Sequence, residues 1–432
     1  MVINLPYGTQ KIPLTLADNA NVTVLRSSVD LMVNKMEAGK IVQEAMKNPI
    51  ESPMLKELAR GKKTATIIIS DHTRPVPSRQ IIPFMLEDLR LGNPQIEITL
   101  LVATGLHRET TKTELIHKLG EDIVAREKIV VHDCQDKEAN REIGILPSGA
   151  RLVINKLAIE TDLLLAEGFI EPHFFAGFSG GGKSVLPGVS DRVTVLENHC
   201  SSFIDNPNAR AGILEGNPIQ TDITAAVKLA KLAFIVNVVI NEKEEVVAAF
   251  AGDALAAHRM GCKYLQNYCF VDAAPADVVI TTNGGAPLDQ NIYQCVKGLS
   301  TAEATARPGA VLIICAECAD GIGGEDFYRS LSQSKEAHTL YDQIMQTPQG
   351  KTIPEQWQTQ ILARILKKHQ VIFVTRPELQ KTLLEMKLGY APTVEKALSN
   401  ARENFNFEPS LTVIPNGVSL VVGVESSPSL TG

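Results

Sequence analysis

Export signals, membrane spans and a surplus of positive charge are all missing from this chain of 432 residues. Residues 1–16 contain no apolar segment of the kind that an export signal requires, and no apolar run reaches the length of a membrane span. The net charge is −7, and no stripe of Lys and Arg could follow a nucleic-acid backbone. These absences predict a cytoplasmic protein that binds neither membrane nor nucleic acid.

A disulfide framework is missing as well. The seven cysteines are an odd number and are scattered, and only Cys315 and Cys318 have CxxC spacing. Without a second pair, this usage favours reduced thiols over a redox or zinc pair. Hydrophobic residues make up 44% of the chain, so a core of useful size is available without cross-links.

Short apolar runs that alternate with helix-period segments are present nearly throughout. The runs are rich in β-branched residues and almost continuous, which is typical of strands buried on both faces. The expected strands are residues 64–70, 96–104, 128–133, 162–169, 234–241, 277–283, 310–316 and 371–375, and the expected helices are residues 78–91, 219–232, 254–268, 354–368 and 394–404. This order predicts an α/β protein with largely parallel sheets and a domain connector near residues 267–277.

A glycine-rich segment, GFSGGGKS at residues 177–184, matches the phosphate-loop pattern of nucleoside triphosphatases. The ATPase alternative needs a long helix that starts at Lys183, yet Pro187 and Gly188 follow too closely. Residues 170–176 also separate the segment from the preceding strand. Because adjacent glycines let a large ligand approach the backbone, Lys183 could instead contact or attach a flat cofactor.

Unusual polar segments follow four of the expected strands. In open α/β sheets, ligands bind at this end of the strands. Four of the nine histidines, His72, His107, His173 and His199, lie in these segments or just after them, and for His72 a local structural or positioning role is expected. Histidine serves in proton transfer near neutral pH and as a metal ligand. Structural or solvent-exposed roles are expected for His117, His258, His338 and His369, which lie in helical or polar stretches.

Other side chains in these segments leave two interpretations open. Arg74 and Lys297 could hold a carboxylate or phosphate, or form surface salt bridges. Asp71 could accept a hydrogen bond from a ribose hydroxyl or cap a helix. Trp357, the only tryptophan, could pack in the core or cover a substrate.

Taken together, the segments resemble the nickel-pincer-nucleotide lactate racemase family. DHTRPVP at residues 71–77, ATGLHR at 103–108, EPHFFAGFSGGGKSVLPG at 171–188, ENH at 197–199 and NIYQCVKG at 291–298 occur in order over most of the chain. The resemblance implies two α/β domains with an active-site cleft between them. It assigns residues 1–268 plus 408–432 to the larger N-terminal domain and residues 272–405 to the C-terminal domain.

The resemblance also implies a cofactor and a set of site residues. The cofactor is a pyridinium mononucleotide that bears a thioamide and a thiocarboxylic acid, holds nickel through two sulfurs and a ring carbon, and is made by dedicated maturation proteins. Lys183 matches the lysine that attaches it covalently, and His199 matches the nickel ligand. His107 and His173 match the acid/base pair; Asp71, His72, Thr73 and Arg74 match the nucleotide-binding segment; Gln294, Lys297, Tyr293 and Trp357 match substrate-binding positions.

The activity implied is an isomerase reaction, the inversion of a small 2-hydroxy acid at its carbinol carbon by hydride transfer. Two histidines are needed because either enantiomer can be the substrate. Malate or an aldonate in place of lactate would require only a change of pocket lining, so the substrate within this class stays open.

Overall fold

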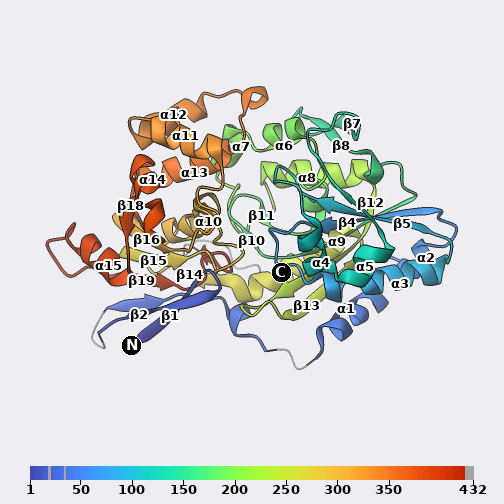
Figure 1. Ribbon diagram of the computed structural model, residues 1–432, viewed down its shortest axis with the longest axis horizontal. Helices are drawn as coiled ribbons and strands as arrows, with labels where there is room; N and C mark the ends of the chain where they lie inside the picture. Colours follow the sequence, from blue (N-terminus) through green and yellow to red (C-terminus); the bar gives the residue numbers. More distant parts are fainter. Residues whose placement is uncertain (18–20, 34–35, 424–432) are drawn as a thin grey trace.

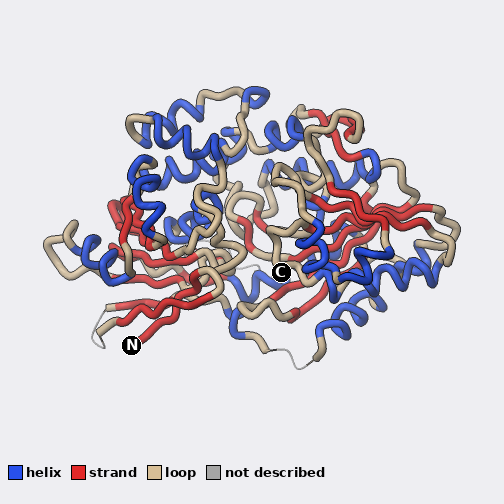
Figure 2. Tube along the Cα trace, in the orientation of Figure 1, coloured by secondary structure: helices blue, strands red, loops and turns tan. Residues whose placement is uncertain are grey.

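The computed structural model describes residues 1–17, 21–33 and 36–423. Two lobes lie side by side, each built around a six-stranded sheet with helices outside it (Figures 1 and 2). Within those ranges, no helix is both long enough and apolar enough to cross a membrane. The expected fold class, two α/β domains with largely parallel sheets, is confirmed.

The first sheet lies in the right-hand lobe of Figure 1 and has the order β13-β12-β9-β4-β5-β6. All its neighbours are parallel except β13, which runs antiparallel to β12. Its strands are β4 (Thr64–Ser70), β5 (Glu97–Ala103), β6 (Lys128–Val131), β9 (Leu163–Phe169), β12 (Leu232–Ile240) and β13 (Val246–Gly252). Ile67 and Ile69 of β4 face one core and Ile68 faces another, as the two-residue period of a strand requires.

Helices cover both faces of this sheet. The core on the Ile67 side includes residues of α1 (Ala38–Lys47), α2 (Leu55–Leu58), α3 (Ile82–Gly92) and α4 (Lys112–Leu119). The core on the Ile68 side includes residues of α8 (Pro218–Ala230) and of the hairpin β7 (Asn140–Ile145) and β8 (Arg151–Asn155). The helix α9 (Ala254–Cys269) packs on β12 and β13.

The second sheet lies in the left-hand lobe, and all its strands are parallel. Its order is β18 (Gly389–Ala391), β17 (Gln370–Val374), β16 (Ala306–Cys315), β15 (Ala276–Thr282), β19 (Leu411–Ile414) and β3 (Val22–Val24). The helices α10 (Ile292–Glu303) and α13 (Gln356–Leu366) pack against one face. The hairpin β1 (Val2–Tyr7) and β2 (Gln10–Thr15), with α15 (Val394–Arg402), covers the other.

The remaining elements belong to neither six-stranded sheet. They are α5 (Glu121–Arg126), β10 (Pro172–His173), β11 (Gly177–Phe178), α6 (Arg192–Asn198), α7 (Ser201–Asp205), β14 (Phe270–Asp272), α11 (Glu325–Gln333), α12 (Ala337–Met345), α14 (Gln380–Glu385) and β20 (Val421–Gly423). Seen together in Figure 1, β10 and β11 lie between the lobes. The site is therefore assembled where loops from both sheets meet.

Of the two C-terminal strands, only β19 differs from the expected assignment of residues 408–432 to the N-terminal domain, whereas Val421 of β20 packs with Phe178 and Val239 of the first lobe. β19 bonds to β15 and β3, which places residues 411–414 in the second sheet. β20 pairs with β14, and residues 424–432 lie outside the described residues. The first strands of the chain also share the second lobe, because β3 pairs with β19. The other expected domain bounds remain a prediction.

Candidate active site

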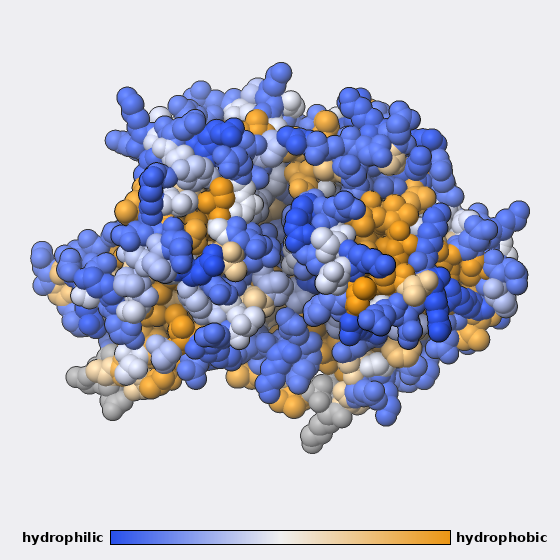
Figure 3. Space-filling view, viewed as in Figure 1, coloured by the Kyte–Doolittle hydropathy of each residue, from blue (hydrophilic) through white to orange (hydrophobic). Residues whose placement is uncertain are grey.

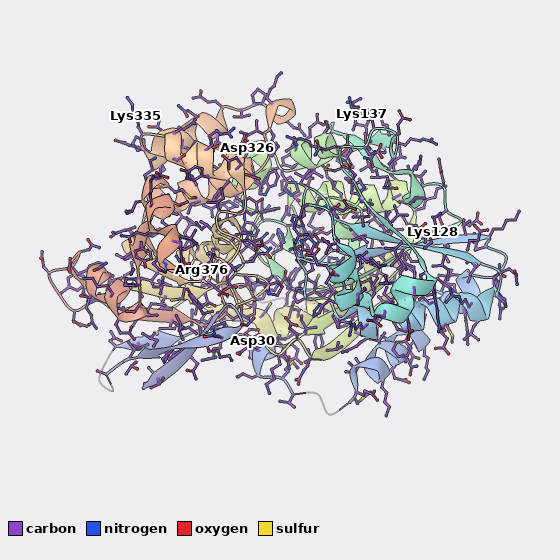
Figure 4. The ribbon with its side chains drawn as sticks, in the orientation of Figure 1. Asp30, Lys128, Lys137, Asp326, Lys335 and Arg376 are labelled. Carbon is purple, nitrogen blue, oxygen red and sulfur yellow. The ribbon has the colours of Figure 1, made fainter. Side chains whose placement is uncertain are left out.

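A cavity of about 620 Å³ opens between the two lobes. Figure 3 shows the surface hollowed between them, and Asp326, labelled in Figure 4, lines the cavity from the second lobe. The ends of β4, β5 and β9 contribute lining residues from the first lobe, and α10 contributes them from the second. Every site residue expected from the sequence lines this cavity: Asp71, His72, Thr73, Arg74, His107, His173, Lys183, His199, Tyr293, Gln294, Lys297 and Trp357.

Asp71 and His107 form a hydrogen-bonded pair at the ends of β4 and β5. Nδ1 of His107 lies 2.7 Å from Oδ2 of Asp71, while the other carboxylate oxygen accepts from the Thr73 hydroxyl at 2.7 Å. Burial alone would raise the pKa of Asp71, but His107, Arg74 and Thr73 hold it well below its ordinary value. The ionised carboxylate keeps the His107 proton on Nδ1, so Nε2 is the free acceptor. Asp71 therefore orients a histidine, a role that neither interpretation from the sequence included.

The loop after β4 is fixed by a buried carboxylate that the sequence analysis did not single out. Glu167 of β9 accepts from the Ser70 amide at 2.9 Å and from the Ser78 hydroxyl at 3.0 Å. On the far side of this loop, Nζ of Lys118 donates to the carbonyl of Arg74 at 3.2 Å. Because both ends of the loop are tied down, Asp71 and Arg74 are held beside the cavity.

His173 enters the cavity from the short hairpin β10–β11. Its Nδ1 accepts from the Ala176 amide at 3.2 Å, so the neutral ring carries its proton on Nε2. Burial, followed by the charges of Lys183, Lys297 and Arg74, lowers the pKa of His173 well below its ordinary value. The two expected acid/base histidines thus have opposite tautomers.

His199 is the C-cap residue of α6 and is 4% exposed. Burial and the charge of Lys183 lower its pKa to about 3, and its Nδ1 has no hydrogen-bond partner among the described residues. A buried neutral imidazole is a suitable metal ligand. Among those same residues, however, no group of three or more His, Cys, Asp or Glu side chains could hold a metal. A metal at His199 would need other ligands from a bound group.

Lys183 follows the three glycines and lies within a four-residue 3-10 helix, Gly181–Ser184. Burial, then the charges of Arg74 and Lys297, lower the pKa of Lys183 to about 7. The amide of Gly181 donates to Asn237, and the amide of Lys183 donates to the Gly180 carbonyl. With these amides used inside the protein and no long helix behind them, the segment lacks the geometry of a phosphate loop.

The second lobe supplies the helix α10 and an aromatic lid. Gln294 and Lys297 lie on α10, and burial with the charge of Arg74 lowers the pKa of Lys297 to about 7. Trp357 of α13 has its ring centroid 4.9 Å from that of His199. Burial raises the pKa of the neighbouring Tyr293 well above its ordinary value. These rings exclude water from one side of the cavity.

Three cationic side chains face one another inside the site. Arg74, Lys183 and Lys297 line the cavity together, and each lowers the pKa of His173. Cations in a cleft with low-dielectric walls attract small anions. The cavity is thus suited to a carboxylate and to the phosphate of a nucleotide.

Further lining residues were missed because they carry no local signal. They are Ser184, Arg192, Gln290, Asp320, Glu355 and Gln358, among others. Glu355 is in the left-handed conformation, with φ of 65°, and its carboxylate accepts from the Phe327 amide at 2.8 Å. Three of them lie beside residues already singled out: Ser184 follows Lys183, Gln290 precedes the NIYQCVKG segment, and Gln358 follows Trp357.

The chain matches two family models. These are the lactate racemase N-terminal domain over residues 7–212 and the lactate racemase C-terminal domain over residues 271–422. The chain belongs to the lactate racemase family. The second match includes β19, in agreement with its pairing in the second sheet.

Members of the lactate racemase family resemble this chain over its full length. The lactate racemase of Thermoanaerobacterium thermosaccharolyticum is 49% identical over 97% of this chain and 99% of its own length. That of Lactiplantibacillus plantarum is 46% identical over 98% and 100%. The solved apoprotein structure from T. thermosaccharolyticum superposes with a TM-score of 0.94 at 48% identity, covering 98% of this chain and all of that one.

A more distant structure, a Thermotoga maritima protein, has a TM-score of 0.68 at 19% identity and covers 93% of this chain and all of that one. It shows a shared fold alone. Membership of the lactate racemase family makes the chain an enzyme of the racemase class, an isomerase, as the sequence predicts.

Proposed function

We propose that this enzyme inverts the carbinol carbon of a small 2-hydroxy acid, with lactate as the first candidate, using a nickel-pincer nucleotide attached to Lys183. The observation that carries the proposal is the meeting of His107, His173, His199 and Lys183 around one cavity. A binding protein would have no need of two histidines in complementary tautomers. The relatives named above are lactate racemases, which supports lactate within this substrate class.

The residues present fit such a cofactor. His199 offers a buried, neutral imidazole, and Lys183 offers an amine that no described carboxylate pairs with. Arg74, with Thr73 beside it, lies where a nucleotide phosphate could be held. The described residues contain no complete metal-ligand cluster, which is consistent with a nickel ion that arrives within an organic pincer. When bound, this group supplies an electrophilic centre that can accept and return a hydride.

His107 and His173 handle the proton of the substrate hydroxyl. Nε2 of His107 is free to accept it, because Nδ1 is committed to Asp71 at 2.7 Å. Nε2–H of His173 can hydrogen-bond to the oxygen of the transient 2-keto acid, as a neutral imidazole does when it polarises a carbonyl. In the opposite direction His173 would accept the hydroxyl proton at Nε2, which requires its own proton to move to Nδ1 and the hydrogen bond from the Ala176 amide to be released. Each ring contributes roughly 10²–10⁴-fold to the rate.

Lys297 and Gln294 bind the substrate carboxylate through the turnover. A fixed contact at the carboxylate lets the rest of the molecule present either face without leaving the site. Tyr293 and Trp357 cover the reacting carbon and exclude water, which would otherwise compete for the transient keto acid.

The proposal is tested by intact mass and elemental analysis of the chain co-expressed with cofactor-synthesis proteins. We expect a mononucleotide-sized mass increase on the Lys183 peptide and about one nickel per chain. A chiral screen of lactate, malate and aldonates then identifies the substrate. A chain with neither nickel nor nucleotide, despite a proven cofactor supply, would remove the proposal.

Single variants separate the roles of the histidines. His107→Ala and His173→Ala should lose roughly 10²-fold or more of the activity with the cofactor still attached. His199→Ala should instead lose nickel while keeping the nucleotide mass. Near-parental activity in either of the first two variants would reject the acid/base pair, and full nickel occupancy in the third would reject the ligand.

A further inference from the structure

The glycine-rich loop is held from behind by two buried polar side chains that the proposed reaction does not use. Oδ1 of Asn237, on β12, accepts from the Gly181 amide at 2.7 Å. Nε2 of His258, on α9, lies 2.8 Å from the carbonyl oxygen of Ser179. A carbonyl can only accept, so His258 must carry its proton on Nε2. Asn237 is 1% exposed and His258 is 8% exposed.

The loop also lies against these side chains so closely that it must be glycine. A Cβ atom on Gly181 would lie 2.5 Å from the ring of His258, and one on Gly180 would lie 2.6 Å from Oδ1 of Asn237. Both glycines have positive φ, of 53° and 80°. Two hydrogen bonds and two close approaches therefore fix the backbone that leads directly into Lys183.

The position of this backbone decides where the Lys183 amine lies. Gly180, Gly181 and Lys183 all line the cavity, while His258 and Asn237 lie outside it. The amine is near Arg74, Lys297 and Glu171, the charged groups that act on its protonation, and burial has the largest effect. A loop that moved away from α9 would carry the amine toward water.

We propose that His258, together with Asn237, is a positioning residue that holds residues 179–182 and so places the Lys183 amine for covalent attachment of the mononucleotide. The inference rests on the proposed function. In the attachment, the amine nitrogen bonds to the carbon of a thiocarboxylic acid group and the carbon–oxygen bond breaks. One amine proton and the thiol proton leave with that oxygen as water, and no oxidant is required.

The first test measures the amine in the chain without cofactor. Competitive acetylation with acetic anhydride, from about pH 6 to about pH 10, is followed by mass spectrometry of the Lys183 peptide. The parent should show a midpoint at about 7. In His258→Leu the Ser179 carbonyl loses its donor and water reaches the loop, so we expect the midpoint to rise by about one pH unit or more.

Two matched variants separate positioning from general stability. His258→Gln keeps an N–H near the place of Nε2 and should restore the parental midpoint. Leu265→Ala removes a buried side chain of the same helix, 2% exposed, and should leave the midpoint unchanged. A parental midpoint in folded His258→Leu overturns the inference. If that variant does not fold, Asn237→Ala tests the same loop from β12, with the same expected rise.

The second readout is the fraction of chains that carry the mononucleotide after co-expression with cofactor-synthesis proteins. We expect it to fall by about tenfold in His258→Leu and to stay near the parental level in His258→Gln and Leu265→Ala. Equal loading in all four proteins would overturn the inference. If the parent itself carries no adduct, the proposed function fails, whereas the acetylation midpoint still decides the role of His258.

Discussion

At the scale of single residues, Asp71 determines what His107 can do. The pair is joined by one hydrogen bond of 2.7 Å, and the depressed pKa of Asp71 reflects its preference for the charged form beside His107. An ionised, buried carboxylate at Nδ1 fixes the ring and stabilises the imidazolium that forms when Nε2 accepts a proton. The same carboxylate also binds Thr73, so the loop and the base are oriented together.

Asp71→Asn should lower kcat by roughly 10²–10⁴-fold in cofactor-loaded enzyme. The amide has a similar shape but can donate to Nδ1, which moves the His107 proton to Nε2 and removes the base. The measurement is kcat per nickel-loaded chain. The matched control is Asp136→Asn, because the Asp136 carboxylate is exposed and accepts a hydrogen bond from the Glu138 amide. Activity equal to that of the control would show that Asp71 does not orient the base.

Lys297 gives the site a pH dependence with a defined sign. Its pKa is lowered to about 7 by burial and by Arg74, so the cation is present below that pH and is lost above it. The KM for a carboxylate substrate should therefore rise above pH 7, by up to about tenfold per pH unit.

In Lys297→Arg the guanidinium stays charged, so the KM profile should be flatter on the alkaline side. Measurements of KM from acidic to alkaline pH check this expectation. Lys381→Arg is the control, because Lys381 is exposed. A KM that is constant across this range in the parent would mean that Lys297 does not supply the charge for the carboxylate.

At the scale of elements, the glycine-rich segment is a packed loop. Gly180 faces Asn237, Gly181 faces His258, and Gly182 faces Val227 and Ile223 of α8. Three successive glycines are required because three different elements approach the same short stretch of backbone. The letter-for-letter match to a phosphate loop thus arises from packing constraints. The motif alone would have pointed wrongly to an ATPase.

Gly182→Ala tests this packing. The added Cβ would lie 2.4 Å from Val227 and 2.7 Å from Ile223, so we expect a destabilisation of about 1–3 kcal/mol. Gly350→Ala, where the nearest atom would be 3.9 Å away, is the control and should lose little. The thermal midpoints of both variants give the comparison, and an unperturbed Gly182→Ala would contradict the close approach.

At the scale of the whole molecule, the chain crosses between the lobes more than once. It runs from β3 in the second sheet to α1 beside the first, and later from α9 to β15. Asp30, labelled at the lower centre of Figure 4, lies on the first of these crossings. Its carboxylate accepts from the Ser419 hydroxyl at 2.6 Å, which ties this segment to the last one.

Burial raises the pKa of Asp30 to about 6, although the hydrogen bond from Ser419 lowers it. The negative charge of Glu242 adds to the rise. A raised carboxyl pKa contributes stability that is complete below the unfolded value of 3.8 and is lost as the pH passes about 6. Asp30→Asn should therefore be more stable than the parent above neutral pH, by about 1–2 kcal/mol, and nearly equal to it at about pH 4. Thermal midpoints of both proteins, measured across this pH range, test the sign of the stability difference. A stability difference that does not change with pH would show that ionisation of Asp30 is not its cause.

Much of the fold was predictable from local pattern. β4 was expected and found at the same residues, 64–70, because a continuous run of β-branched side chains has few other stable conformations. The hairpins β1–β2 and β7–β8 were missed, since their short strands alternate with polar and proline residues. In the site, His107 and His173 were found because they follow strands, whereas Glu167 was missed because it lies inside one.

The sequence by itself determined the parallel α/β architecture, the racemase resemblance and the histidines and cations that meet in the cavity. Each of these depends on local periodicity or on motifs whose letters are adjacent in the chain. Only the tertiary structure decided that β19 joins β15 and β3, that Asp71 pairs with His107, and that His258 supports the Lys183 loop. These contacts join residues far apart in the chain, and they form only where the packed core brings distant backbone segments within hydrogen-bonding distance.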